Sequence, residues 1–86
     1  MIMHRKEGIA TDFARNLGVA VRDQRERIGL RQDELALAAG VSTRVVHQIE
    51  HGKPTSRLDS VLPVLDALGI DIEISQHESG REEGRT

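Results

Sequence analysis

Apolar residues recur at every third or fourth position in the first third of the chain. That period predicts a helix from about Asp12 to Arg27, with one face turned toward a core. Thr11 or Asp12 can cap its first turn, and Gly29 follows its last turn as a stop signal. The predicted apolar face consists of Phe13, Leu17, Ala20, Val21 and Ile28. Residues 1–10 show no such period and are predicted to form a flexible arm.

Two shorter helices follow the first, and a glycine lies just after each of them. The earlier one is predicted over Gln32–Ala39 and ends at Gly40. The later one is predicted over Thr43–Glu50, with Ser42 as its N-cap and Gly52 after its end. This stretch therefore predicts two helices joined by a tight turn.

A fourth helix is predicted to end at Leu68, but its start is open to two interpretations. A cap at Ser56, with an acid three residues on, would place Pro63 inside the helix, where proline removes a hydrogen bond. A cap at Ser60 would place Pro63 in the first turn, where it costs little. We favour a turn at residues 57–59 followed by the helix.

Strict alternation of apolar and acidic residues appears once, in the segment Ile70-Asp71-Ile72-Glu73-Ile74. This pattern predicts a half-buried strand over residues 70–75. The chain has no second strand pattern, and a lone strand leaves its backbone groups unpaired. The simplest partner is the same strand of a second copy, so Ile70, Ile72 and Ile74 are predicted to form a homodimer contact. Residues 76–86 have no apolar residue and are predicted to be a disordered tail.

Length and charge restrict the possible functions. Eighty-six residues make one small domain, for which self-association adds buried area. Residues 1–57 carry ten Lys and Arg against seven Asp and Glu, a charge of +3, whereas residues 58–86 carry two against seven, a charge of −5. A basic front half joined to an acidic back half indicates two partners or two faces, although such charges can also simply solvate a small domain.

Composition also argues against several function classes. The absence of cysteine excludes disulfides, thiolate metal sites and cysteine nucleophiles, and it fits the cytoplasm. No apolar run approaches the roughly 20 residues of a membrane span, and the first eight residues do not form a signal peptide. We expect that the protein is not an enzyme and binds no cofactor, because the sequence shows no nucleophile–base pair, sequestered carboxylate pair or phosphate loop. His47 and His51 have a spacing that suits a metal, but a third ligand is missing, so we expect phosphate contacts and no metal.

The segment 32–51 carries the clearest functional signal. Two helices that cross closely need a small residue at the crossing, here Ala36, and a turn residue that tolerates positive φ, here Gly40. The apolar residues that close a small core between the helices are Leu35, Val41, Val46 and Ile49. This combination is typical of a helix-turn-helix motif, and an ordinary helical hairpin is the alternative.

The stretch Leu30–Gly52, LRQDELALAAGVSTRVVHQIEHG, resembles the phage-repressor or Xre type of helix-turn-helix, and the likeness extends from about Leu17 to Gly69. The resemblance implies an all-α, lambda-repressor-like domain of four to five helices, here residues 11–69, whose second motif helix lies in the major groove of DNA. Together with the predicted strand, the expected fold is this domain with one short C-terminal strand that pairs across a homodimer.

The resemblance also implies roles for individual residues. The positions that face base edges in that family are occupied here by Ser42, Thr43, Arg44 and Gln48. Gln32 would bind phosphate, and Arg25 would pair with Glu50 to hold the recognition helix in place. The family usually has Thr or Ser just before Gln32, but Arg31 stands there in this chain, which weakens the helix cap and adds a charge that can reach phosphate.

The chemistry of these side chains agrees with the resemblance. Arginine can form a bidentate pair with guanine and glutamine with adenine, and each such pair discriminates by roughly 1–3 kcal/mol. Lys53, Arg57 and the loop amides between them are placed where a DNA backbone should pass, so they are predicted to position the domain. The residues predicted to contact phosphate are Arg31, Gln32, His47, His51, Lys53 and Arg57.

The end of the matched region, GKPTSRLDSVLPVLDALGIDIEIS (Gly52–Ser75), resembles more specifically the HipB type of antitoxin. That resemblance implies a protein that represses its own operon, binds and neutralises a HipA-like serine/threonine kinase toxin, and is degraded from its tail. A stand-alone dimeric Xre-type repressor and a pure protein-interaction module remain as alternatives. Both repressor hypotheses expect a dimer with two recognition helices roughly 34–36 Å apart on a palindromic operator.

Overall fold

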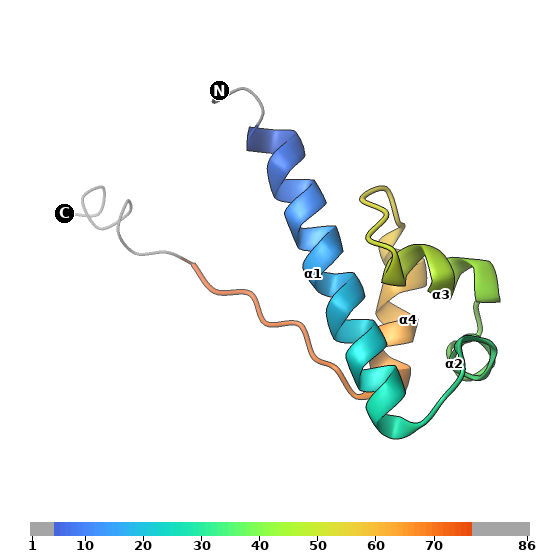
Figure 1. Ribbon diagram of the computed structural model, residues 1–86. Coiled ribbons are helices and arrows are strands. Elements are labelled where there is room, and N and C mark those ends of the chain that lie inside the picture. The colour runs from blue at the N-terminus through green and yellow to red at the C-terminus, as the bar shows by residue number, and fades with distance from the viewer. Residues whose placement is uncertain (1–4, 77–86) are drawn as a thin grey trace.

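The computed structural model describes residues 5–76, which form four helices connected by short loops (Figure 1). Helix α1 spans Arg5–Ile28, α2 spans Gln32–Ala39, α3 spans Thr43–Glu50 and α4 spans Leu58–Leu68. The bounds of α2 and α3 are the predicted ones. The prediction of an all-α domain is confirmed for the described part of the chain.

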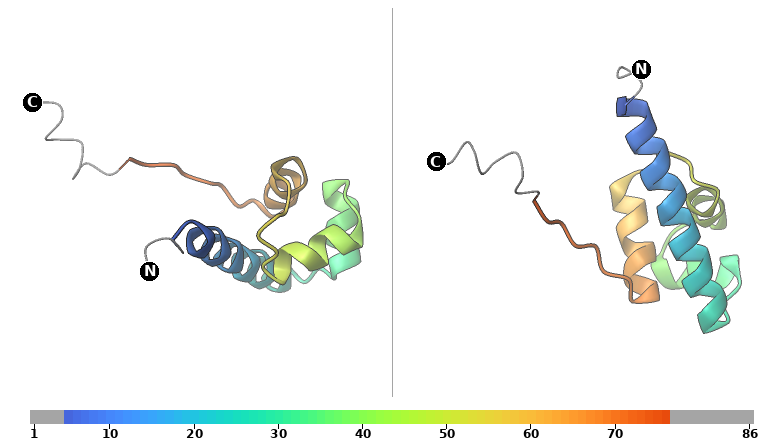
Figure 2. Two further views of the ribbon diagram at one scale, coloured as in Figure 1. Left: turned by 90° about the horizontal axis from the view of Figure 1, so that it is seen from above. Right: turned by 60° about the vertical axis from the view of Figure 1, so that its left-hand side comes forward.

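The four helices are arranged so that one face of α3 packs against other helices of the bundle. Helices α1 and α4 lie next to each other, and α2 and α3 cover one side of this pair (Figures 1 and 2). Helix α3 packs on both α1 and α2, and α2 also packs on α4. The first turns of α1 project beyond the other three helices (Figure 1).

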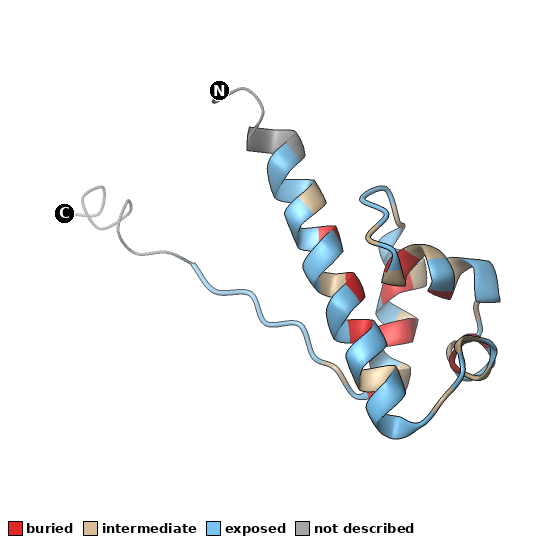
Figure 3. Ribbon diagram, viewed as in Figure 1, coloured by how far each residue is buried: buried red, intermediate tan, exposed pale blue. Residues whose placement is uncertain are grey.

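A small aliphatic core joins all four helices (Figure 3). Each helix contributes residues that are almost fully buried: Ala14, Val21, Leu35, Ala36, Val46, Ile49, Val61, Val64, Leu65 and Leu68. The four residues predicted to close the motif behave as expected, since Leu35, Val46 and Ile49 are buried and Val41 packs against this core. Gly40 has a φ of 74°, which confirms the turn geometry expected at that position.

The buried face of α1 differs from the predicted one. Phe13, Ala20 and Ile28 are exposed, whereas Ala14 and Gly18 are buried beside the correctly predicted Val21. The cause is a close crossing of α1 and α3. A Cβ atom added to Gly18 would lie 2.5 Å from the backbone oxygen of Ile49, so only glycine lets the two helices approach this far.

The start of α1 is also corrected. The helix begins at Arg5, seven residues before the predicted start at Asp12, so residues 5–10 of the predicted arm are helical. Apart from Gly8, residues 5–11 have adequate helix propensity, and Ile9 continues the four-residue spacing toward Phe13. Residues 1–4 of the predicted arm lie outside the described residues.

Helix α4 begins earlier than the favoured interpretation placed it. Arg57 is the N-cap and Leu58 the first helical residue, so Pro63 lies inside the helix and the predicted cap at Ser60 is wrong. The amides of Ser60 and Val61 donate to the carbonyl oxygen of Arg57 at 3.0 and 2.9 Å. Burial of the apolar residues after Pro63 outweighs the single hydrogen bond that proline removes.

The strand predicted over residues 70–75 is not observed. Residues 70–76 leave α4 after Gly69 as a chain without secondary structure. The amide of Ile70 donates to the oxygen of Leu65 at 2.9 Å, and Ile70 packs against the core. Ile72 and Ile74 are exposed. Most of the predicted disordered tail, from residue 77, lies outside the described residues.

None of the described helices is both long enough and apolar enough to cross a membrane.

Candidate nucleic-acid interface

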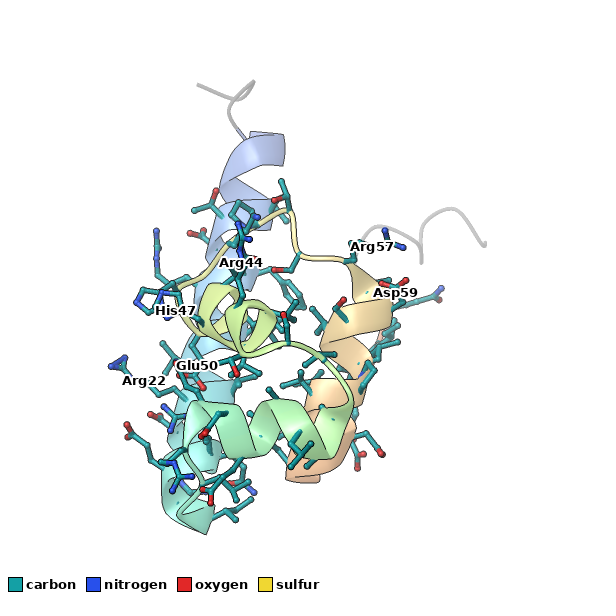
Figure 4. All side chains as sticks on the ribbon, turned by 90° about the vertical axis from the view of Figure 1, so that its right-hand side faces the viewer. Arg22, Arg44, His47, Glu50, Arg57 and Asp59 are labelled. Atoms are coloured by element: carbon teal, nitrogen blue, oxygen red, sulfur yellow. The ribbon has the colours of Figure 1, made fainter. Side chains whose placement is uncertain are left out.

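Helix α3 divides sharply into a buried and an exposed face. Val46 and Ile49 are buried against the other helices, while Thr43, Arg44 and His47 are exposed. Figure 4 shows Arg44 and His47 extending from α3 into solvent. One face of α3 is therefore fixed by packing, and the opposite face presents a row of polar side chains to solvent.

The start of α3 is fixed by Ser42. Its hydroxyl oxygen accepts a hydrogen bond from the amide of Val45 at 3.2 Å, which confirms the predicted N-cap. Ser42 was also predicted to read bases, and its hydroxyl proton stays available for that role. Arg44 forms no ion pair with any described residue, so its guanidinium has all of its donors to offer.

The last turn of α3 is fastened by a cluster of three side chains from three helices. Arg25 donates from Nε to Oε2 of Glu50 at 2.6 Å and from Nη2 to Oε1 at 3.0 Å. Gln32 donates from Nε2 to the same Oε1 at 3.1 Å. Arg25 also donates to the carbonyl oxygen of Leu30 at 2.8 Å, which includes the α1–α2 loop in the cluster. We call Arg25, Gln32 and Glu50 the clamp.

The clamp is shielded from water. The side chain of Glu50 is 3% exposed and that of Arg25 is 12% exposed. Burial alone would raise the pKa of Glu50, but the hydrogen bonds from Arg25 and Gln32 and the positive charges of Arg25 and Arg22 together lower that pKa below its usual range. The hydrogen bond to Glu50 correspondingly raises the pKa of Arg25. Both groups are therefore charged, and the bidentate geometry fixes α3 on α1.

The clamp contains the pair of Arg25 and Glu50 that the family resemblance implies, and Gln32 is a third member. Gln32 was predicted only as a phosphate contact. Its side chain is half-buried, and one of its amide protons is already directed at Glu50. The second amide proton has no partner among the described residues, so holding Glu50 and reaching a phosphate are compatible.

A hollow of about 190 Å³ lies beside α3, between the α3–α4 loop and the start of α4. Val45 forms an apolar part of its lining, and the rest consists of cations, hydroxyls and an amide: Gln48, Lys53, Thr55, Ser56, Arg57 and Ser60. The loop that forms its wall is ordered by its own hydrogen bonds, since the amide of Lys53 donates to the oxygen of Gln48 at 3.1 Å and the hydroxyl of Ser56 to the oxygen of Lys53 at 3.0 Å. Such a set of donors suits a phosphate group.

The hollow brings together Gln48, Lys53 and Arg57, which were predicted separately. Sequence reasoning missed Thr55 and Ser60 as hydroxyl donors, and it missed Ser56, whose hydroxyl proton is already donated to the oxygen of Lys53. The signal that could have found them is the pair Thr55–Ser56 in the loop after α3 with Ser60 four residues further on, but hydroxyl residues are also a common loop composition.

Two of the predicted phosphate contacts are already paired with carboxylates. Arg31 lies 3.1 Å from Asp33, and its backbone amide donates to Glu34 at 2.8 Å, which partly replaces the missing cap. Arg57 forms two hydrogen bonds with Asp59, at 2.7 and 3.1 Å. These neighbours reduce the positive charge that either arginine presents, an effect the residue pattern alone did not reveal.

His47 of α3 and His51, the C-cap of that helix, stack on each other. Their ring centroids lie 4.0 Å apart, and Nδ1 of His51 lies 2.9 Å from the carbonyl oxygen of His47. Within the described residues, no group of three potential ligands suited to a metal includes them. Both rings are exposed at the C-terminal end of α3, next to the loop that leads to Lys53.

The fold and the free polar face of α3 define a DNA-binding helix-turn-helix domain. The family model described as "Helix-turn-helix" matches residues 21–75. An "uncharacterized HTH-type transcriptional regulator y4mF" of Sinorhizobium fredii (strain NBRC 101917 / NGR234) is 48% identical over 59 residues, which cover 69% of this chain and 78% of that protein. The chain therefore belongs to the helix-turn-helix family of DNA-binding transcription regulators.

Proposed function

We propose that this protein is a sequence-specific transcriptional repressor that inserts α3 into the major groove of operator DNA. The observation that carries the proposal is the combination of the buried clamp behind α3 with the unpaired Arg44 on its exposed face. A helix held in this way presents its side chains to base edges at little entropic cost on binding. Ser42, Thr43, Arg44 and Gln48 read the bases, with Arg44 suited to guanine and Gln48 to adenine.

The DNA backbone passes on both sides of α3 in this proposal. On one side it lies over the hollow, where Lys53 and the hydroxyl of Thr55 meet a phosphate. On the other side it meets the start of α2, where Arg31 and the second amide proton of Gln32 are available. His47 and His51 complete the phosphate contacts beside α3. None of these contacts distinguishes one base pair from another.

The operator is palindromic, because the repressor acts as a homodimer. The support is the alternation in residues 70–75, whose isoleucines at 72 and 74 are exposed in the single chain. In the dimer this segment pairs with its copy as an antiparallel two-stranded ribbon, which satisfies the backbone groups on the paired edge. The dimer then sets two copies of α3 about one helical turn of DNA apart.

We further propose that this repressor is the antitoxin of a type II toxin–antitoxin pair, which represses its own operon in the cytoplasm and neutralises a HipA-like kinase toxin. What supports this proposal is the likeness of residues 52–75 to that class and the charge of −5 on residues 58–86, a surface chemistry unsuited to DNA. A stand-alone dimeric repressor is the second candidate, and it uses the same DNA chemistry.

One experiment tests both levels of the proposal. The tagged full chain is recovered from its native host, co-purified protein is identified by mass spectrometry, and bound DNA is sequenced. Recovery of its own promoter with a stoichiometric kinase-like protein is the expected result. Recovery of operator DNA alone would refute the antitoxin role, and recovery of a protein without any enriched DNA would refute the repressor.

A further inference from the structure

The N-terminal half of α1 exposes large apolar side chains that have no function in the reading of DNA. Ile9 is 64% exposed and Phe13 is 58% exposed, and the two lie one turn apart on the same face. This half of the helix precedes the part of the chain matched by the family model, which begins at Val21. It therefore lies outside the part of the chain that the family model matches.

Two other segments share this property. Helix α4 exposes Leu58 and Leu62, again one turn apart, and the segment after α4 exposes Ile72 and Ile74. That segment leaves the bundle on the side away from α2 and α3 (Figures 1 and 2). Most of the large exposed apolar side chains of the described chain thus belong to α1, α4 and the segment 70–76, and not to the DNA-reading helices.

We infer that Ile9 and Phe13 form a second contact surface of the homodimer, covered by a second copy of this chain. The inference rests on the proposed function, because it takes the dimer from there and adds an element that the strand model does not contain. In it, each α1 contributes its first turns to the interface, and the isoleucines of the paired segments 70–75 pack with them.

The area that a stable dimer needs supports this assignment. Standard interfaces bury about 800 Å² on each partner. A ribbon of two six-residue strands is only about 20 Å long and is marginally stable by itself, since it needs an apolar surface under one face. A fully exposed phenylalanine can bury roughly 150–250 Å². Phe13 is 58% exposed, so each copy has about half of that area left to bury, and a Phe13 and an Ile9 from both copies supply part of the area that the ribbon lacks.

A second copy also fits better than a segment of the same chain. Residues 77–86 contain no aliphatic or aromatic side chain that could cover Ile9 and Phe13. A second copy brings an identical pair of apolar residues and the exposed Ile72 and Ile74, which allows a two-fold interface in which the same patch meets on both sides.

The test compares three substitutions in the full-length protein, each of which places one extra negative charge on an exposed helix surface. Ile9→Glu and Phe13→Glu alter the proposed surface. Leu37→Glu is the matched control, because Leu37 is 84% exposed but lies on α2, within the DNA-reading motif. Analytical ultracentrifugation over a concentration series gives the dimer dissociation constant, circular dichroism checks the fold, and Ile72→Asp is measured in parallel.

The expected result is a rise of about 100-fold in the dimer dissociation constant for Phe13→Glu, because each substitution occurs twice in a two-fold dimer. Ile9→Glu should give a smaller rise, and Leu37→Glu should match the wild type. Equal constants for Phe13→Glu and Leu37→Glu would overturn the inference. If Ile72→Asp dissociates the dimer while Phe13→Glu does not, the inference fails and the proposed dimer stands. A wild-type protein that is monomeric throughout refutes both.

Discussion

The two halves of α1 have opposite relations to the rest of the chain. The C-terminal half is completed within one chain, because Val21 is buried in the core and Arg25 is bonded to Glu50. In the described part of the N-terminal half only Ala14 is buried, and Ile9 and Phe13 have no described partner that buries them. The contrast shows that contacts within one chain fix the geometry of α3. The exposed apolar residues of α1 have no such contacts, and in our proposal a second chain covers them.

The largest effect should follow from Glu50→Ala, which removes the acidic member of the clamp. The substitution leaves Arg25 buried without its partner, and breaking a buried ion pair in this way costs about 3–5 kcal/mol. Urea denaturation should show this loss in the free energy of unfolding. Glu26→Ala is the control, because the side chain of Glu26 is exposed and its carboxylate comes no nearer to the Arg25 guanidinium than 4.0 Å. Equal stability of the two variants would contradict the clamp.

Acid should weaken the same contact. The pKa of Glu50 is lowered in the folded state, so its contribution is fully present above the unfolded value of about 4.3. That contribution is lost as the pH falls through the folded-state pKa. The Glu50→Gln variant should therefore lose less stability than the wild type between neutral pH and acid, as measured by urea denaturation at each pH.

Glycine substitutions compare the two halves of α1 directly. Gly18→Ala should destabilise by about 1–3 kcal/mol, because the new Cβ would lie 2.5 Å from a backbone oxygen of α3. Gly8→Ala meets no atom within 4 Å and should stabilise the helix by about 0.5–1 kcal/mol. Thermal unfolding measures the change in stability for each variant. If both substitutions stabilise the protein, or both destabilise it, the proposed difference in packing between the two halves of α1 is refuted.

Gln32→Ala sharpens the account of the clamp. Loss of the hydrogen bond to Glu50 should cost about 1 kcal/mol of stability without DNA present, since Gln32 is half-buried. A residue that contacted only phosphate would leave the stability of the free protein unchanged. The measurement is urea denaturation of the free variant, followed by its affinity for DNA over a range of salt.

Lys53→Ala should have the smallest effect. It should weaken binding to all DNA sequences alike and reduce the slope of log affinity against log salt by about 1. Arg57→Ala should change that slope less, because Asp59 already neutralises Arg57. Salt titrations by fluorescence anisotropy compare the two, and a larger effect for Arg57 would contradict the assigned pairing.

Much of the bundle could be predicted from the sequence, because Leu35, Ala36, Gly40, Val46 and Ile49 follow rules of local spacing. The close crossing at Gly18 could not, because it depends on a contact between residues thirty positions apart. The added role of Gln32 and the pairing of Arg57 with Asp59 depend likewise on side-chain geometry. The strand prediction depends on a second chain, which no contact within this one can supply.

The most direct test of the central claim is selection of bound DNA from a random pool by the full-length protein and by Arg44→Ala. The account predicts that the wild type enriches an inverted repeat whose half-sites are centred about one helical turn apart. The variant should enrich the same repeat with one base pair in each half-site no longer specified. An unchanged motif for Arg44→Ala, or no enriched motif for the wild type, would contradict the assignment of α3 as the reading helix.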